Sequence, residues 1–318
     1  MTTVVVTPHR FVDLEPERST LEPLGAEVIA AADVEELERL APGADALLVT
    51  SFVTIGGDLI RRLGNCRAIV RYGIGVNEVD VDAATTAGIP VGNVLDASVS
   101  EVADHAVMLA LACLRRLPET AAGVAAGAWD VSPMRGARRL STLTAGILGL
   151  GRIGTAVGRR LEAFGMTIVG YDPYVHDSPF PRLTLEELLG RADLVCVHLP
   201  LTAETRGLLS DEKLALLGPG AVVVNVARGG IVDEIALARR LGDGSLWGAG
   251  LDVFAEEPLP AAHPLRAAPH MVMTPHAAWY SVESGRDLQW RAAEQAARAL
   301  RGEWLDPVVN PDVYKRAG

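Results

Sequence analysis

Three ionisable side chains in the second half of the chain each come shortly after an apolar run. Arg228 follows residues 221–227, Glu257 follows 250–253 and a brief loop, and His276 follows 271–273 and two further residues. Short apolar runs of this kind are typical of buried strands in a parallel sheet. Because the carboxyl ends of such strands face the ligand crevice, we expect Arg228, Glu257 and His276 to converge on one site.

The three side-chain types complement one another chemically. Arginine binds a carboxylate through two parallel hydrogen bonds and keeps its charge. Histidine titrates near neutral pH and, when positioned as a general acid or base, contributes ~10²- to 10⁴-fold to a rate. A glutamate on the second ring nitrogen fixes the tautomer and favours the protonated ring. The set suits reduction of a 2-keto acid, with Arg228 binding and polarising the substrate, His276 protonating the new alkoxide and Glu257 tuning His276.

Each residue also has an ordinary structural explanation. Arg228 could cap a helix or lie on the surface, Glu257 could be a solvated loop acid, and His276 could be a satisfied polar residue beneath the sheet. All three residues follow a nucleotide-binding motif in the sequence, which favours the interpretation that they act together as catalytic residues. The acidic pairs 233–234 and 256–257 have no histidine or third acid spaced to complete a metal site, so we expect no metal.

The nucleotide-binding motif is a glycine-rich turn, G-x-G-x-x-G, between an apolar run that ends at Leu148 and a helical pattern that ends near Phe164. The turn comprises Gly149, Gly151, Arg152, Ile153 and Gly154. Its glycines allow a tight bend, a close approach to a pyrophosphate, and packing of the helix on the strand. Asp172 follows Gly154 by 18 residues, near the spacing of the acid that takes the ribose hydroxyls. No arginine stands beside Asp172 to receive a 2′-phosphate, which favours NAD(H) over NADP(H).

The elements that must position these residues alternate between strands and helices in both halves of the chain. This alternation predicts an α/β fold of two doubly wound parallel-sheet domains with an active-site cleft between them. We expect a discontinuous, flavodoxin-like substrate-binding domain over residues 1–98 and 282–318, because the segment 304–310 is expected to return to the first domain. A Rossmann NAD-binding domain is expected over residues 99–281. The pattern Ser98-x-x-Glu101 predicts the start of a helix that ends near Arg116 and links the two.

The composition is that of an ordinary globular protein. The 318 residues are 49% hydrophobic and 22% charged, with a net charge of −11, so nucleic acid is not an expected partner. Three cysteines without C-x-x-C spacing predict neither a disulfide framework nor a zinc site. No basic stretch precedes an apolar one at the N-terminus, and no apolar run reaches the ~18 residues of a membrane helix, so no membrane contact and a cytoplasmic location are expected.

Together these motifs resemble the D-isomer-specific 2-hydroxyacid dehydrogenases from about residue 4 to residue 310. The resemblance lies in the glycine turn and in the segments 225–234 (NVARGGIVDE), 250–258 (GLDVFAEEP) and 274–281 (TPHAAWYS). It implies an NAD-dependent enzyme that interconverts a 2-keto acid and a D-2-hydroxy acid, with Arg228, Glu257 and His276 as its catalytic residues. It also implies a homodimer formed through the nucleotide domain and an arm over residues 118–139.

The resemblance implies further site residues. Those expected beside the cofactor are Pro200, Thr205, Ala227 and Asp252, the last holding the nicotinamide amide. Those expected beside the substrate are Arg71, Tyr72, Gly73, Ile74, Gly75 and Trp279, with the backbone N–H groups of 71–75 receiving the substrate carboxylate. A plain turn at a strand end explains Gly73 and Gly75 nearly as well.

Within the family, Trp279, Arg71 and the segment 171–174 resemble the C-terminal-binding-protein branch. Animal members of that branch are NADH-responsive corepressors, so an NADH-sensing scaffold is a second hypothesis. Those corepressors keep the same three catalytic residues, which therefore do not separate the two hypotheses. Formate dehydrogenases carry glutamine where Glu257 stands, which disfavours them. The identity of the keto acid is not indicated by the sequence.

Overall fold

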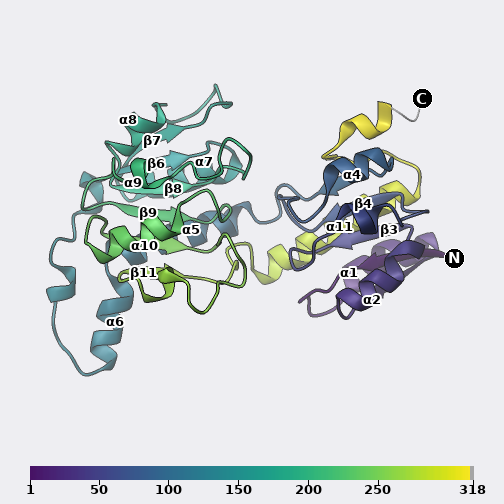
Figure 1. Cartoon of the computed structure of the whole chain (residues 1–318), viewed down its shortest axis with the longest axis horizontal. Coiled ribbons are helices and arrows are strands. Elements are labelled where there is room, and N and C mark those ends of the chain that lie inside the picture. Colours follow the sequence, from purple (N-terminus) through teal and green to yellow (C-terminus); the bar gives the residue numbers. More distant parts are fainter. Residues whose placement is uncertain (316–318) are drawn as a thin grey trace. The chain divides into compact units, whose positions relative to one another are not determined.

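The computed structural model describes residues 1–315, which form two compact units. Unit 1 comprises Met1–Ser98 and Ser281–Gly318, and unit 2 comprises Val99–Tyr280. The second stretch of unit 1 begins at Ser281, where residue 282 was expected. Each unit is a parallel sheet covered by helices on both faces, as expected for an α/β protein (Figure 1). No helix within residues 1–315 is long and apolar enough to cross a membrane.

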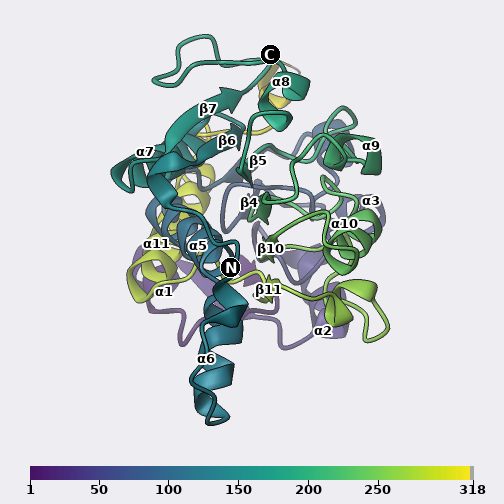
Figure 2. The ribbon, with the colours of Figure 1, turned by 90° about the vertical axis from the view of Figure 1, so that its left-hand side faces the viewer.

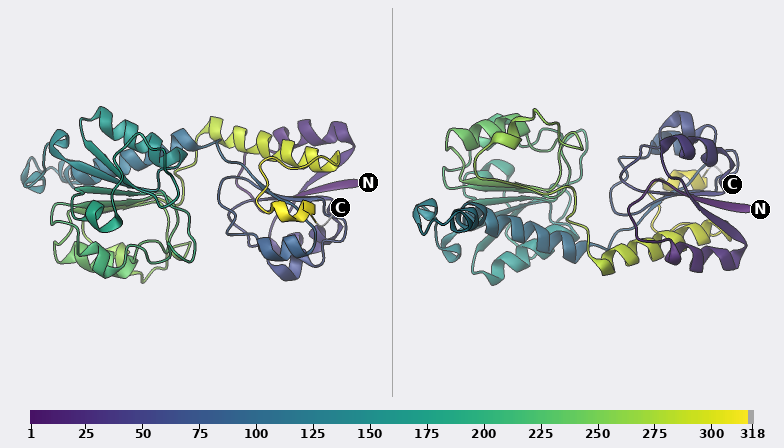
Figure 3. Two further views of the ribbon diagram at one scale, coloured as in Figure 1. Left: turned by 90° about the horizontal axis from the view of Figure 1, so that it is seen from above. Right: turned by 90° about the horizontal axis from the view of Figure 1, so that it is seen from below.

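Unit 1 contains a five-stranded sheet in the order β2-β1-β3-β4-β5. Its strands are β1 (Thr2–Val6), β2 (Ala26–Ala30), β3 (Ala46–Val49), β4 (Ala68–Arg71) and β5 (Val91–Asn93). Its helices are α1 (Glu15–Leu21), α2 (Val34–Leu40), α3 (Gly57–Ile60), α4 (Val81–Thr86) and α11 (Val282–Leu300). Helices α1 and α11 lie side by side on one face of the sheet (Figure 3), and apolar residues of α2, α3 and α4 pack on the other.

The chain re-enters unit 1 at Ser281, so α11 already belongs to that unit, and the segment that follows α11 pairs with β5. The Val309 N–H donates to the Val91 carbonyl at 2.7 Å, and the Asn310 carboxamide accepts from the Val91 N–H and donates to the Ile89 carbonyl. Strand β5 is therefore held by a segment more than 200 residues away in sequence. The sequence does not predict β5, because a three-residue strand carries too little pattern to be recognised.

Unit 2 contains a six-stranded sheet in the order β11-β10-β9-β8-β6-β7. Its strands are β6 (Thr144–Leu148), β7 (Thr167–Tyr171), β8 (Leu194–Val197), β9 (Val222–Asn225), β10 (Gly248–Leu251) and β11 (Met271–Met273). Its helices are α5 (Val99–Leu114), α6 (Leu117–Ala125), α7 (Arg152–Ala163), α8 (Leu185–Leu189), α9 (Asp211–Leu214) and α10 (Glu234–Gly242). Helices α5 and α7 cover one face, and α8, α9 and α10 cover the other.

Two helices of unit 1, α1 and α4, were not anticipated from the sequence. The apolar periodicity of helix α1 is interrupted, because its buried face includes the charged residue Glu17. Helix α6 has no buried residue and stands away from the rest of unit 2 (Figure 2), where an exposed arm was expected.

Candidate active site

The three predicted catalytic residues follow three neighbouring strands. Strands β9, β10 and β11 are adjacent in the sheet of unit 2 and all run parallel. Arg228, Glu257 and His276 stand in the loops that leave their carboxyl ends. The sheet order therefore brings together loops whose residues are spread over nearly 50 positions of sequence.

His276 and Glu257 form a direct pair. The Nδ1 atom of His276 lies 2.7 Å from Oε2 of Glu257, and the Phe254 N–H donates to Oε1 of the same carboxylate at 2.9 Å. Partial burial alone would raise the pKa of Glu257. The hydrogen bond and charge of His276, the Phe254 N–H and the charge of Arg228 outweigh burial and hold the pKa below its ordinary value. Glu257 thus stays an acceptor at neutral pH and leaves Nε2 of His276 as the outward ring nitrogen.

Asp252 holds the loop that carries His276. Its side chain is fully buried, and it accepts hydrogen bonds from the Thr274 hydroxyl at 2.6 Å, the Ala277 N–H at 2.9 Å and the Ala278 N–H at 2.8 Å. The Asp252 carbonyl accepts from the His276 N–H at 2.8 Å. These bonds fix His276 at φ 53°, a left-handed conformation that a non-glycine residue rarely adopts. The structure therefore gives Asp252 internal partners, whereas the family resemblance implied a contact with the nicotinamide.

Arg228 is placed by a tight turn after β9. The Asn225 side-chain amide donates to the Arg228 carbonyl at 2.8 Å, and Nη1 of Arg228 donates to the Ala227 carbonyl at 2.7 Å. Gly229 then passes so close to the backbone of Phe254 that a Cβ would lie 1.9 Å from its carbonyl carbon. Only glycine fits there, and the close passage sets the Arg228 loop directly against the loop of Glu257.

The glycine turn has the geometry of a phosphate cradle. Gly149 has φ 96°, and a Cβ on Gly151 would meet nothing within 4 Å, so the backbone is open to a ligand at the start of α7. A Cβ on Gly154 would lie 1.9 Å from the Gly149 carbonyl oxygen, so that glycine is needed for helix packing. These features fit a dinucleotide whose pyrophosphate lies at the N-terminus of α7.

Asp172 lies beside this turn as expected. Its carboxylate accepts from the Leu150 N–H at 2.8 Å and from the Tyr174 N–H at 2.9 Å. Arg182 also lies near Asp172 in three dimensions, and its Nη2 donates to the Asp172 backbone carbonyl at 3.1 Å. No local pattern predicts this contact, because ten residues separate the two and a bridge between Gly170 and Arg182 brings them together.

The remaining residues expected near the cofactor lie in loops of unit 2. The Thr205 hydroxyl donates to the Pro200 carbonyl at 2.6 Å and so closes the loop after β8. Ala227 donates its N–H to the Asn225 side chain at 3.0 Å. Trp279, expected beside the substrate, is partly buried against the hydrophobic core of unit 2, and its ring lies edge-to-face with that of Tyr280 at 5.4 Å between centroids. Among the described residues no group of three or more His, Cys, Asp or Glu is arranged to hold a metal ion.

The predicted substrate loop, residues 71–75, belongs to unit 1 and follows β4. Arg71 is buried, its Nη1 donates to the Tyr72 carbonyl at 2.6 Å, and its Nε lies 3.5 Å from Oε2 of Glu78. Gly73 has φ 125°, and a Cβ there would lie 2.0 Å from Nη1 of Arg71. The guanidinium therefore lies against the start of the loop, where it binds the Tyr72 carbonyl and leaves no room for a side chain at position 73.

Tyr72 anchors this loop from within unit 1. Its hydroxyl donates to Glu17 on α1 at 2.7 Å, and the carboxamide of Gln289 on α11 donates to the other oxygen of Glu17 at 3.0 Å. Burial raises the pKa of Glu17, against the lowering effect of these hydrogen bonds. Glu17 and Gln289 were missed at the sequence level, because a single polar residue on a helix gives no sign of being buried.

The fold and the site define a class: an α/β protein whose doubly wound nucleotide-binding unit carries an arginine, a glutamate and a histidine at adjacent strand ends. The chain belongs to the D-isomer specific 2-hydroxyacid dehydrogenase family, since residues 107–278 match the NAD binding domain of that family. Unit 2 is therefore an NAD-binding domain.

Similar proteins with known names support the assignment to this family. The chain is 39% identical to a D-3-phosphoglycerate dehydrogenase of Mycobacterium leprae over 93% of its own length and 57% of the relative's. It is 34% identical to a hydroxypyruvate reductase of Thermotoga maritima over 84% of the chain and 88% of the relative. The structure of an NAD-dependent formate dehydrogenase from Staphylococcus aureus in complex with NAD superposes with a TM-score of 0.87, at 30% identity over 96% and 97% of the two chains. These relatives give no support to the C-terminal-binding-protein branch or to a corepressor role.

Proposed function

We propose that the protein is an NAD-dependent D-2-hydroxyacid dehydrogenase that reduces a 2-keto acid. The observation that carries this proposal is the 2.7 Å pair of His276 and Glu257, which stands in the loops next to that of Arg228 on an NAD-binding domain. Carbonyl reduction requires a proton donor and a positive charge beside the carbonyl oxygen. The histidine held by a carboxylate supplies the first, and the permanent cation in the adjoining loop supplies the second.

In the proposed mechanism each residue acts at a stated atom. NADH, when bound over the glycine turn, supplies the hydride. Arg228 binds the keto acid through its guanidinium and polarises the carbonyl. His276 delivers the proton from Nε2 to the oxygen that gains negative charge, while Glu257 holds Nδ1 and stabilises the charged ring before transfer. Oxidation of a D-2-hydroxy acid uses the same groups in reverse.

The other expected residues are proposed in supporting roles. The N–H groups of residues 73–75 would receive the substrate carboxylate. The side-chain hydrogen bonds of Arg71 and Tyr72 would hold the start of this loop in place. Trp279 would form an apolar wall for the substrate side chain. Asp172 would take the ribose hydroxyls of NAD, and Pro200, Thr205 and Ala227 would line the cofactor.

The proposal is tested with purified protein and NADH against a panel of 2-keto acids with branched, thioether, aryl, hydroxymethyl and phosphorylated side chains. Oxidation of NADH is followed by absorbance, and the product's configuration is determined by chiral chromatography. We expect a D-2-hydroxy acid from at least one member of the panel. Tight NADH binding without turnover of any keto acid would refute the reductase.

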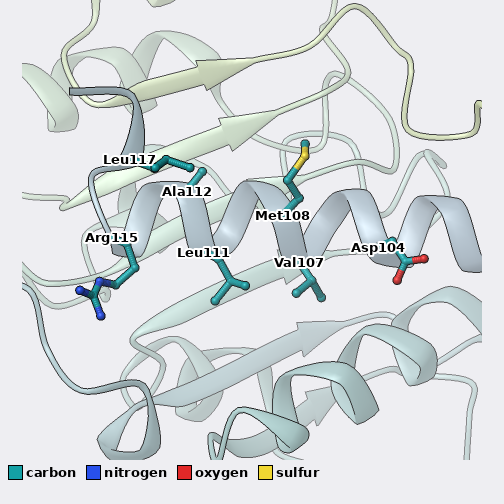
Figure 4. Close-up of a pocket in the computed structure, with 7 residues that line it drawn as sticks. All are labelled: Asp104, Val107, Met108, Leu111, Ala112, Arg115 and Leu117. Atoms are coloured by element: carbon teal, nitrogen blue, oxygen red, sulfur yellow. The ribbon is translucent and has the colours of Figure 1, made fainter. Parts of the chain in front are cut away.

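We further propose that the chain forms a homodimer through α5 and the arm that follows it. Val107, Met108, Leu111, Ala112 and Leu117 line an apolar hollow along α5, with Asp104 and Arg115 toward its two ends (Figure 4). On the arm, Trp129 is 92% exposed. Clustered apolar groups of this kind mark interaction surfaces.

Light scattering after size exclusion tests the dimer. The wild type is expected at twice the 33.6 kDa of one chain. Met108→Glu places a charge in the hollow and is expected to give the monomer mass. Val12→Glu replaces an exposed apolar residue of unit 1, outside the proposed interface, and should change nothing. A monomeric wild type would refute the proposal.

A further inference from the structure

Helix α5 lies directly against strand β10, because two glycines of that strand leave room for it. A Cβ on Gly248 would lie 3.4 Å from Cβ of Cys113, and a Cβ on Gly250 would lie 2.9 Å from Cβ of Leu109. Alternate residues of a strand share one face. Asp252, two positions after Gly250, therefore faces the same helix.

The register between helix and strand places one further residue of α5 opposite Asp252. The two helix residues that meet the glycines are four positions apart, which is about 6 Å of rise, and the two glycines span about 6.6 Å of strand. The next step along both elements pairs His105, four positions before Leu109, with Asp252. In agreement with this register, Nε2 of His105 lies 3.7 Å from Oδ1 of Asp252.

A third residue, Thr274, joins His105 to Asp252 by hydrogen bonds. Nε2 of His105 lies 2.9 Å from Oγ1 of Thr274, and the Thr274 hydroxyl donates to Oδ1 of Asp252 at 2.6 Å. The side chain of His105 is 17% exposed and that of Asp252 is fully buried, so water competes little for these bonds.

The donors and acceptors of these three groups fix the direction of both bonds. A hydroxyl has one proton, and an ionised carboxylate only accepts. Since the Thr274 proton is directed to Asp252, Oγ1 has only lone pairs to offer His105, and the ring must carry a proton on Nε2. The same carboxylate accepts from the two backbone N–H groups that directly follow His276. One set of bonds therefore runs from α5 to the backbone of the loop that carries His276.

We propose that His105 is a positioning residue for the active site. By donating from Nε2 to the Thr274 hydroxyl, it directs that hydroxyl to Asp252 and keeps the loop over residues 274–280 in the conformation that presents His276. His105 itself takes no part in proton transfer. Its effect on catalysis rests on the proposed function, in which His276 is the general acid, but its effect on the loop can be measured without turnover.

Three variants of His105 separate the hydrogen bond from the shape of the ring. His105→Phe keeps a ring and removes both nitrogens, His105→Gln keeps an N–H near the position of Nε2, and His105→Asn keeps one near Nδ1, out of reach of Thr274. The measurements are kcat and KM for the best keto acid of the panel, and hydrogen–deuterium exchange of the backbone over residues 274–280.

We expect His105→Phe to lower kcat roughly 3- to 10-fold and to speed exchange over residues 274–280 by a similar factor, as the loss of one hydrogen bond predicts. KM is expected to change little, because Arg228 stands in another loop. His105→Gln is expected to restore both kcat and slow exchange, and His105→Asn is expected to restore neither.

A second test asks whether His105 acts through Thr274. Thr274→Val removes the hydroxyl, so His105→Phe is expected to have almost no further effect on kcat in that background. The matched control is His270→Asn, in a histidine of the same unit whose Nδ1 lies 2.8 Å from Glu119. Asparagine tolerates the φ of 60° at this position, and the control is expected to leave kcat and exchange unchanged.

Three results would overturn the proposal. The first is wild-type kcat and wild-type exchange in His105→Phe. The second is a His105→Gln variant no better than His105→Phe, because the shape of the site would then matter and the hydrogen bond would not. The third is an undiminished effect of His105→Phe in the Thr274→Val background. Wild-type protein that reduces no keto acid would refute the reductase, and exchange over residues 274–280 would still decide the role of His105.

Discussion

The position of His276 depends on the buried carboxylate of Asp252, and Asp252→Asn tests that dependence. In the wild type, Oδ1 accepts from the Thr274 hydroxyl and the Ala277 N–H, and Oδ2 accepts from the Ala278 N–H. Asparagine oriented with its oxygen at Oδ1 keeps the first two bonds. Its amide nitrogen then faces the Ala278 N–H, so a donor meets a donor. In the reverse orientation the amide nitrogen faces the Ala277 N–H, while the Thr274 hydroxyl can accept from it, so in either orientation one backbone N–H loses its acceptor.

The magnitude follows from this count. Losing one hydrogen bond to a charged acceptor and leaving its N–H buried costs about 2–3 kcal/mol. For a unit the size of unit 2, that loss lowers Tm by roughly 4–12 °C. Because the same bonds hold His276 in a left-handed conformation, the loop is expected to relax and kcat/KM to fall at least ~10-fold, within the general acid contribution of ~10²–10⁴.

The assays are thermal unfolding followed by circular dichroism, steady-state kinetics on the best keto acid of the panel, and the Kd for NADH. Asp177→Asn, an exposed aspartate of the same unit, is the control for unfolding. We expect a lower Tm and lower kcat with a nearly unchanged Kd for NADH. An unchanged Tm with weakened NADH binding would refute the reasoning and give Asp252 the nicotinamide contact instead.

Three further outcomes are expected. His276→Ala should abolish turnover while leaving the Kd for NADH nearly intact, and normal turnover in stopped-flow assays would remove the acid/base assignment. Asp172→Ala should weaken NADH more than NADPH, because Arg182 already lies at the Asp172 carbonyl; titrations showing equal losses for both would contradict the ribose role. Glu17 has a raised pKa, so the folded state binds its proton more tightly than the unfolded state, and its contribution to stability is lost as pH rises through that pKa. Urea unfolding should therefore show Glu17→Gln gaining stability relative to wild type as pH rises, and a pH-independent difference would exclude this linkage.

Local sequence patterns were sufficient for much of the architecture. The apolar runs before Gly149, Arg228 and His276 predicted buried parallel strands; β6 and β9 lie there and are buried, while β11, at the edge of the sheet, is only partly buried. The glycine spacing predicted the cofactor turn because its requirements are local: a positive φ at Gly149 and room for the helix at Gly154. Such patterns can be recognised without knowledge of the fold, since each depends on residues a few positions apart.

Contacts between distant segments depended on the tertiary structure. The sequence proposed Glu257 as the partner of His276, but only the adjacency of β10 and β11 sets Nδ1 at 2.7 Å from the carboxylate. The internal bonds of Asp252, the approach of Arg182 to Asp172 and the hydrogen bond between His105 and Thr274 have no sequence signature. The chain alone determined which residues stand at strand ends and which chemistry they suit. The order of the strands decided which of those residues meet, because pairing between strands is a long-range property that no local pattern encodes.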